Sequence, residues 1–264
     1  MIGIRNAEQV QKMRDAGVLL NGVHQHLRKM IVPGVTTRQL NEEATRIIRE
    51  GGGIPSFLGV PASYPGYPSF PAAICASPDD QVVHGFPTDE PLREGQIISI
   101  DGGVILNGWQ SDSAFTAPVG QVSKELADLI RVTEECFWLG AKQARAGNRI
   151  GDISQAVQVH AEAHGYGVIR DLCGHGIGTQ MHEDPSVPNF GPAGRGVRLR
   201  AGMTICIEPM IAMGGWPIYQ LNDGWTVKTK DHSACSHYEH TILVTEGEPE
   251  ILSLPGANLG EEGR

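Results

Sequence analysis

The stretch Ile97–Asp112, IISIDGGVILNGWQSD, constrains the fold of this chain more than any other. Its first half is an apolar run rich in β-branched residues, and Asn107-Gly108 is the dipeptide that favours a two-residue type I′ turn. If these two residues form the loop, Leu106 pairs with Trp109. The sequence therefore predicts an antiparallel hairpin whose register is set by its turn.

The predicted register places two carboxylates on one face of the hairpin. Asp101 lies opposite Ala114 and Gly103 opposite Asp112, so the aspartates are diagonal neighbours with Cβ atoms roughly 7–8 Å apart or less. One or two divalent cations could bridge that span, although two aspartates are more commonly solvated on an open sheet face. The other side chains divide between this face (Ser99, Gln110 and Thr116) and the core face (Ile98, Ile100, Trp109 and Phe115).

Composition and charge exclude several classes of protein. The 264 residues carry a net charge of −9 without a basic stripe, which argues against a nucleic acid or an anionic membrane as the main partner. The five cysteines are widely spaced and include no CxxC pair, so they indicate neither a disulfide framework nor a zinc finger. The sequence shows neither a signal-sequence pattern nor an apolar run as long as a membrane span. We expect a soluble cytoplasmic protein without direct nucleic-acid specificity.

Apolar residues spaced three and four apart predict four helices, and β-branched runs between them predict further strands. The helices are expected over about 7–30, 37–50, 124–146 and 150–164, and the strands over 72–76, 81–83, 168–171, 204–208, 225–228 and 240–245. No low-complexity linker divides the chain. We therefore expect one domain over 1–264, with a loose tail at 256–264.

The segment Ile54–Ala73 is too rich in proline, glycine and aromatic residues for regular structure. A loop of this kind could form the wall of a pocket. Taken alone, its residues favour the commoner alternative, a plain surface loop whose tyrosines and phenylalanines fold down onto the protein.

Two segments of related sequence indicate an internal duplication. Leu92–Asp101 aligns without gaps on Leu199–Glu208, with identical Leu, Arg, Gly and two Ile residues, and each segment ends in an acid. The order of helices and strands also repeats, which predicts pseudo-symmetric halves at about 1–122 and 123–255. Packing about a pseudo-twofold axis would bring Asp101 and Glu208 from equivalent strand ends into one carboxylate cluster.

Three further groups suit such a cluster. His175 stands between two glycines in CGHGIG, His182 follows it, and Glu239 opens the last strand in YEHTILVT. An oxygen-rich set with one imidazole suits Mn, Fe, Co or Zn in a two-metal site. Any one acid is more commonly a surface charge, and a lone histidine more commonly a hydrogen-bonding residue. The residues alone therefore indicate a two-metal hydrolase, with a phosphoesterase as an alternative. The full set is Asp101, Asp112, His175, Glu208 and Glu239.

The motifs CGHGIG, TICIEPM, DGWTVKTKD and YEHTILVT, with their spacing, resemble those of the type I methionine aminopeptidases. The resemblance covers nearly the whole chain. It implies an α+β pita-bread (creatinase/aminopeptidase) fold, with two pseudo-symmetric halves of helices and antiparallel sheet around a central dimetal site. It also implies removal of the initiator methionine from nascent polypeptides when the second residue is small.

The same resemblance implies roles for individual residues. Glu208 would be the general base, His182 would steady the tetrahedral intermediate or the scissile amide, and His84 would contact the substrate near the leaving group. Asp112 and Glu239 would bridge the metals. Two divalent ions (Co, Mn, Fe or Zn) would be bound by Asp101, Asp112, His175, Glu208 and Glu239. Substrate would be bound by His84, His182, Tyr64, Tyr67, Cys75 and Trp225.

This sequence departs from the family pattern in several places. The spacing from Tyr67 to Cys75 is longer than usual, and Met181 stands where an aromatic residue is usual, which would widen or soften the pocket. Asp79 replaces a common asparagine in a loop sometimes associated with a monovalent cation. Bacterial relatives resemble ribosome-exit binders with a lysine-bearing loop, but Gly214–Asn222 contains no lysine, which predicts weaker ribosome contact. The expected partners are nascent polypeptide N-termini, and the enzyme is expected to be a monomer.

Two alternatives remain beside the methionine aminopeptidase interpretation. A prolidase or Xaa-Pro aminopeptidase of the same fold resembles a longer chain with an extra N-terminal domain, whereas only 83 residues precede His84 here. A pita-bread protein without metals could serve as a binding module. All five ligand positions are filled, which argues against that module, although a ligand set does not by itself ensure that metal is bound.

Overall fold

The computed structural model describes residues 2–62, 65–257 and 259, in which helices combine with antiparallel strands, so the predicted α+β class is confirmed. None of the helices in this part of the chain is long and apolar enough to cross a membrane. The helices are α1 (Ala7–Met30), α2 (Thr37–Glu50), α3 (Lys124–Ala141) and α4 (Ile150–Ala163). The strands are β1 (Ile54–Pro55), β2 (Ile74–Pro78), β3 (Gln81–Val83), β4 (Ile97–Leu106), β5 (Trp109–Pro118), β6 (Gly167–Val168), β7 (Gly174–Gly176), β8 (Glu183–Val187), β9 (Thr204–Ile207), β10 (Met210–Ala212), β11 (Ile218–Gln220), β12 (Val227–Thr229), β13 (Cys235–His237), β14 (Glu239–Leu243) and β15 (Glu250–Ile251).

The helices begin where their capping residues predict. Asn6 closes a capping box at the start of α1, and the Ser123 hydroxyl accepts a backbone N–H at the start of α3. α3 ends at Ala141 rather than near Ala146. The chain leaves the helix there: the Gln143 and Ala144 N–H groups donate to the carbonyls of Gly140 and Ala141, three residues back, and the Ala146 N–H donates to the Thr245 carbonyl at 2.9 Å.

β4 and β5 form the predicted hairpin with the predicted register. Asp101 pairs with Ala114, and the turn is made by Asn107 and Gly108. Both turn residues have positive φ, 52° and 79°, as a type I′ turn requires. The hairpin prediction is confirmed along its whole length.

Several other strands differ from the prediction. β2 begins at Ile74 rather than Ala72, because the Ala73 N–H donates to the Asn41 side chain of α2, at 2.8 Å, and not to a strand. β6 ends at Val168 and is shorter than predicted. β9, β12 and β14 agree with the prediction to within two residues at each end. Short strands such as β7 and β8 were missed because glycine and charged residues interrupt the alternation on which strand prediction depends.

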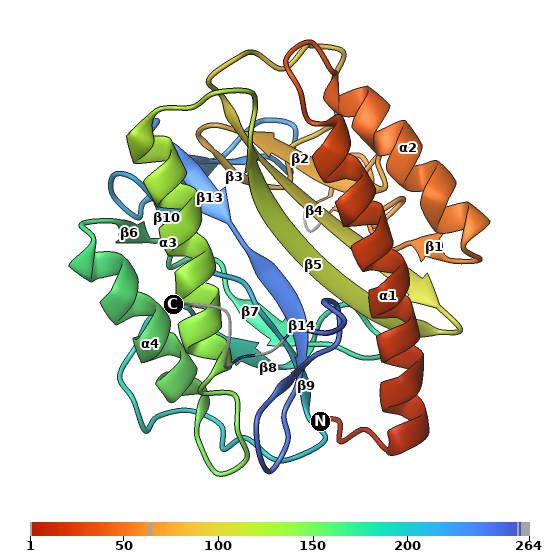
Figure 1. The fold of residues 1–264 in the computed structure, drawn as a ribbon, viewed down its shortest axis with the longest axis vertical. Coiled ribbons are helices and arrows are strands. Elements are labelled where there is room, and N and C mark those ends of the chain that lie inside the picture. Colours follow the sequence, from red (N-terminus) through yellow and green to blue (C-terminus); the bar gives the residue numbers. More distant parts are fainter. Residues whose placement is uncertain (1, 63–64, 258, 260–264) are drawn as a thin grey trace.

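The apolar face of the long hairpin packs against the helices. Leu20 and Leu27 of α1 lie in one buried cluster with Ile98 of β4, Phe115 of β5 and Phe137 of α3. Figure 1 shows the α1–α2 pair and the α3–α4 pair on either side, with β4, β5 and β14 running between them. The helices thus take the apolar face, which leaves the opposite face of these strands for polar side chains.

The two related segments have the same backbone structure. Leu92–Asp101 and Leu199–Glu208 each make a turn and then enter a strand, β4 or β9. Their turn glycines, Gly95 and Gly202, have φ of 86° and 89° and donate to the residue just after β5 or β14. The sheet order β1-β4-β5-β14-β9-β7-β8 joins the halves at β5 and β14. The domain limits near 122 and the loose tail at 256–264 stay predictions, and residues 258 and 260–264 lie outside the described part.

Candidate metal centre and substrate cavity

The sheet register brings the predicted carboxylates together on its polar face. Ala114 pairs with Asp101 on one side and with Glu239 on the other, so these two acids lie in one row across β4, β5 and β14. Glu208 directly follows β9, whose Ile207 pairs with the residue after Glu239, and it therefore extends the same row. Asp112 is only 4% exposed, so the alternative that the two aspartates are solvated on an open sheet face is wrong.

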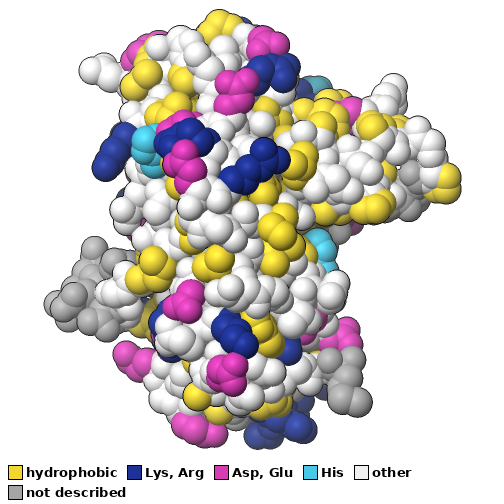
Figure 2. Space-filling model, turned by 90° about the vertical axis from the view of Figure 1, so that its right-hand side faces the viewer, with side chains coloured by type: hydrophobic (Ala, Val, Ile, Leu, Met, Phe, Trp, Pro, Cys, Tyr) yellow, Lys and Arg dark blue, Asp and Glu magenta, His cyan; other side chains and the backbone are white. Residues whose placement is uncertain are grey.

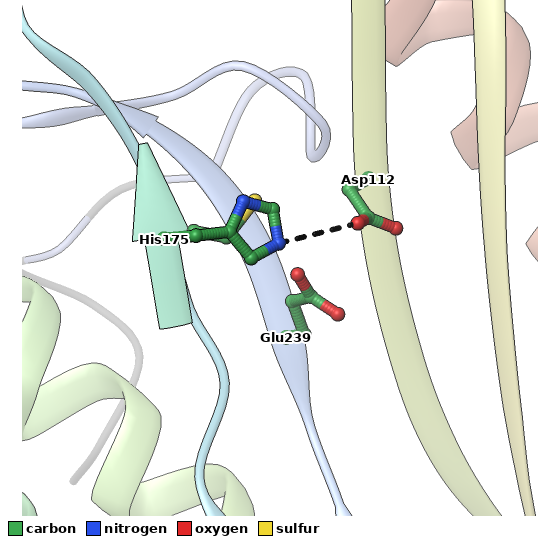
Figure 3. Close-up of side chains that lie close together, drawn as sticks. Asp112, His175 and Glu239 are labelled. Atoms are coloured by element: carbon green, nitrogen blue, oxygen red, sulfur yellow. Dashed lines mark ion pairs between the residues drawn. The ribbon is translucent and has the colours of Figure 1, made fainter. Parts of the chain in front are cut away.

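His175 approaches the carboxylates from β7. Its Nε2 lies 3.7 Å from Asp112 Oδ2 and 3.6 Å from Glu208 Oε1, and Figure 3 shows the ring directed at Asp112 and Glu239. Its Nδ1 lies 2.9 Å from the Gly176 carbonyl oxygen, which can only accept. Nδ1 must therefore carry the proton, which leaves the Nε2 lone pair free for a metal ion.

The glycines on either side of His175 are required by close backbone packing. A Cβ on Gly174 would lie 2.3 Å from the Cys206 carbonyl oxygen, and one on Gly176 would lie 2.1 Å from the Asp184 carbonyl oxygen. Any side chain at either position would push β7 away from its neighbours. The CGHGIG motif thus seats the imidazole by keeping its strand close to β8 and β9.

The cluster is electrostatically unbalanced without a cation. Burial raises the pKa of Asp101 to about 7, and burial together with the neighbouring carboxylates raises the pKa of Asp112, Glu208 and Glu239. The described residues lining the cavity include no lysine or arginine. Asp101 Oδ1, Asp112 Oδ1 and Glu239 Oε1 are buried without a hydrogen-bond partner. This donor set fits divalent metal ions, which would supply the missing positive charge.

The two predicted catalytic histidines lie at the edges of this cluster. The His182 ring centre is 4.4 Å from that of His175, and the His84 ring packs edge-on against Trp225 at 6.2 Å. Burial, reinforced by His182, lowers the pKa of His84 to about 4, and burial lowers the pKa of His182. Both imidazoles are therefore neutral at physiological pH and each can donate one hydrogen bond.

A cavity of about 220 Å³ opens over the carboxylates. Phe57, Val60 and Phe70 of the irregular segment line it, together with Cys75 and Trp225. The surface-loop interpretation of this segment is therefore wrong: its aromatic rings pack on one another and on Trp225 and form the cavity wall. Figure 2 shows hydrophobic side chains on the part of the molecule that projects at the right-hand side of that view.

The predicted tyrosines are not among the described residues of the cavity wall. Tyr67 is 43% exposed and packs against Gly224, whereas Cys75 and Trp225 line the cavity. Tyr64 lies outside the described residues. Phe70, within the 67–75 segment, lies in the wall between Phe57 and Trp225.

Several wall residues were not found from the sequence. In the sequence, Leu172, Cys173 and Met210 are ordinary apolar or weakly polar residues. Nothing in the residues next to them indicates that they line a cavity. His237 could have been found, because it stands two residues before Glu239 and a strand places such residues on one face. Met181, which the sequence showed only as a departure from the family pattern, also lines the cavity.

Two further groups lie away from the cavity. The Asp79 carboxylate accepts the Gln96 side-chain amide at 2.5 Å and the Ile97 N–H at 3.2 Å, so it stabilises the entry to β4, and a monovalent cation there remains a prediction. Glu135 of α3 lies close to His160 and His164 at the end of α4. Its carboxylate already forms ion pairs with Arg131 and His160.

Comparison with known proteins identifies the family. Residues 11–246 match the sequence pattern of a known family, metallopeptidase family M24. The chain is 46% identical over 254 residues to methionine aminopeptidase of Clostridium perfringens, covering 96% of this chain and 99% of that protein. This chain belongs to metallopeptidase family M24. Within that family its relatives at this level of identity are methionine aminopeptidases, so the predicted hydrolase and aminopeptidase class is confirmed.

Solved structures agree with this assignment. The crystal structure of methionine aminopeptidase from Rickettsia prowazekii superposes with a TM-score of 0.91 at 40% identity, covering 96% of this chain and 100% of that chain. The prolidase from Pyrococcus furiosus has a TM-score of 0.74 at 19% identity, covering 96% of this chain but 66% of the prolidase, and shares the fold. The predicted pita-bread fold is confirmed.

Proposed function

We propose that this protein hydrolyses the first peptide bond of nascent polypeptides and so removes the initiator methionine when the second residue is small. The observation that supports this most is the cluster of unpartnered carboxylates beneath an apolar, aromatic-walled cavity. The identity to methionine aminopeptidases over nearly the whole chain supports the same conclusion.

The metal ligands in this proposal are Asp101, Asp112, His175, Glu208 and Glu239, which would hold two divalent ions of Co, Mn, Fe or Zn. Such ions would lower the pKa of water and polarise the scissile carbonyl. The donor set of four carboxylates and one imidazole excludes a thiolate-type structural site, but several metals accept it. Affinity order and cellular supply would then select the metal.

The protein side chains would move protons and orient the peptide. Glu208 would take a proton from the attacking water and pass it to the leaving amine, and its raised pKa suits a group that must accept a proton. His182, neutral and close to His175, would donate a hydrogen bond to the developing oxyanion. His84 would contact the peptide on the leaving-group side, where its ring is held against Trp225.

Selectivity would come from the size of the cavity. An unbranched apolar side chain fits between Phe70, Cys75 and Trp225, and those walls are packed against one another rather than free to open. A small second residue would pass the rim at Phe57 and Val60, whereas a large one would contact it. Met181, a flexible thioether, would make this rim softer than an aromatic ring would.

A pair of peptides tests the proposal against its rivals. Metal-reconstituted protein should release methionine from Met-Ala-Ser and leave Ala-Pro intact. Cleavage of Ala-Pro without cleavage of Met-Ala-Ser would establish a prolidase-type activity instead. Failure to cleave any of the peptides with Mn, Fe, Co or Zn would favour the metal-free binding module.

We further propose that the enzyme acts as a cytoplasmic monomer on chains leaving the ribosome, with weaker ribosome contact than a lysine-rich relative. Residues 214–222 contain no lysine, and Lys228 of β12, which pairs with β11 within them, forms an ion pair with Asp80 at 2.9 Å, so this loop adds no lysine of its own toward ribosomal RNA. Co-sedimentation with ribosomes at low salt, compared with a lysine-rich relative, measures this. Equally tight co-sedimentation would refute it.

A further inference from the structure

Arg5 is a largely buried cation that the proposed reaction does not use. It precedes α1, yet its side chain is only 12% exposed, and its guanidinium lies over the Trp109 ring, 5.4 Å from the ring centre. It also lies outside residues 11–246, which match the family. Arginine side chains are seldom buried without partners, so the contacts of Arg5 indicate what it does.

The Arg5 guanidinium binds both ends of the loop 177–182, which connects β7 to β8. Its Nη2 donates to the carbonyl of Ile177, the first residue of the loop, at 3.2 Å, and forms an ion pair with Glu183, the first residue of β8. Its Nε donates to the Thr204 hydroxyl of β9 at 3.3 Å, and that hydroxyl donates to the same Ile177 carbonyl. One planar group thus joins the start of the loop, its end and a neighbouring strand.

The loop 177–182 depends on such contacts because it belongs to no strand. The Gln180 N–H donates to Glu183 Oε1 at 3.2 Å, so the carboxylate that pairs with Arg5 also binds the middle of the loop. A Cβ on Gly178 would lie 2.1 Å from Arg5 Nη2, which shows how closely the loop backbone packs on the guanidinium. Arg5 and Glu183 together therefore fix the loop against the body of the protein.

His182 is the last residue of this loop. It directly precedes Glu183, and its ring centre lies 4.4 Å from that of His175. His175 is seated by β7, whereas the position of His182 depends on the loop. A donor that must meet a developing oxyanion tolerates little displacement, since a shift of about 1 Å can cost on the order of 100-fold in rate.

We propose that Arg5 is a positioning residue: by binding both ends of the loop 177–182, it keeps His182 where it can donate to the developing oxyanion. This rests on the proposed function, which gives His182 that role. The three partners of Arg5 are not among the described residues that line the cavity. Arg5 should therefore affect the rate only through His182.

A double-mutant cycle on the metal-loaded full chain tests the proposal. Arg5→Met keeps an unbranched side chain without the charge and should lower kcat for Met-Ala-Ser roughly ten-fold, with KM changed less than about two-fold. In a His182→Ala background the same substitution should change kcat less than about two-fold. Arg5→Lys keeps the charge opposite Glu183 and should recover much of the lost rate. Equal losses of kcat in both backgrounds would overturn the proposal.

Arg14→Met is the matched control. Arg14 makes a two-pronged ion pair with Glu250, at 2.7 and 3.0 Å, which also joins the N-terminal region to a distant segment. Its loss should lower Tm and leave kcat unchanged, whereas a loss of kcat equal to that of Arg5→Met would overturn the proposal. Metal content should match wild type in Arg5→Met; loss of metal would place the effect on the ligands rather than on His182 and would also overturn it.

Hydrogen exchange of the metal-loaded proteins separates this proposal from the proposed function. The backbone amides of the loop 177–182 should exchange faster in Arg5→Met than in wild type, and those of β5 should not change. Faster exchange supports the role of Arg5 even if wild type cleaves no peptide, in which case the proposed function alone fails. Unchanged exchange in the loop would overturn the proposal.

Discussion

Replacing Asp101 by asparagine should stabilise the metal-free protein and weaken the metal-loaded one. Asp101 is buried beside Asp112, in the same cluster as Glu208 and Glu239, and the described residues that line the cavity they share include no lysine or arginine. An amide of the same shape cannot ionise there, so it escapes the cost of a buried charge. The same amide is a poorer metal ligand than a carboxylate, and the two effects therefore have opposite signs in the two states of the protein.

The size of the effect follows from the pKa of Asp101. Burial raises it from its ordinary value of 3.8 to about 7, so the folded protein holds a proton that the unfolded chain has lost between those pH values. Stability therefore falls as pH rises through this window, by about 4 kcal/mol in total for this one group. For a chain of this size that corresponds to a change in Tm on the order of 10 °C.

Thermal unfolding after treatment with a chelator measures this directly. At pH 8 the metal-free Asp101→Asn protein should melt well above the metal-free wild type, and below pH 4 the two should melt together. Asp89→Asn is a matched control, because Asp89 is exposed and paired with Arg38, and it should show little difference at either pH. A metal-free Asp101→Asn protein that melts below wild type at pH 8 would refute the electrostatic reasoning.

Three other substitutions test the site and the fold. Glu208→Gln should lower kcat by about 10²–10⁴-fold with an unchanged circular dichroism spectrum, and a near-normal rate would reject its role as general base. Gly17→Ala should cost roughly 1–3 kcal/mol in denaturant unfolding, because its Cβ would lie 2.1 Å from the Leu252 carbonyl oxygen. Gly22→Ala, on the same helix with nothing within 4 Å, should be neutral or stabilising by up to about 1 kcal/mol, and equal losses in both variants would contradict the packing of α1.

Local chemistry explains which parts of the fold could be predicted. Asn6 and Ser123 cap helices through their own side chains, and Asn107-Gly108 sets a turn without help from the rest of the chain. The end of α3 has no such local signal, and the segment that follows it is held by a hydrogen bond from the Ala146 N–H to Thr245, about a hundred residues later. Predictions therefore succeeded where the cause is local and failed where it is tertiary.

The residues of the candidate site also divide into those that local sequence predicted and those that depend on distant partners. The hairpin register gave Asp101 and Asp112 from the sequence alone, and the repeat added Glu208. The aromatic wall was misjudged, because whether Phe70 folds over a cavity or onto a surface depends on Trp225, a distant partner. His237 was overlooked although strand alternation places it on the same face as Glu239.

Release of free methionine from Met-Ala-Ser, measured before and after metal is returned to chelator-treated protein, tests the central claim most directly. Wild type should be inactive without metal and should recover activity with Mn, Fe, Co or Zn, whereas Asp112→Asn, treated in parallel, should stay inactive. Methionine release that is independent of metal, or full recovery by Asp112→Asn, would contradict the claim that this carboxylate cluster is the catalytic metal centre.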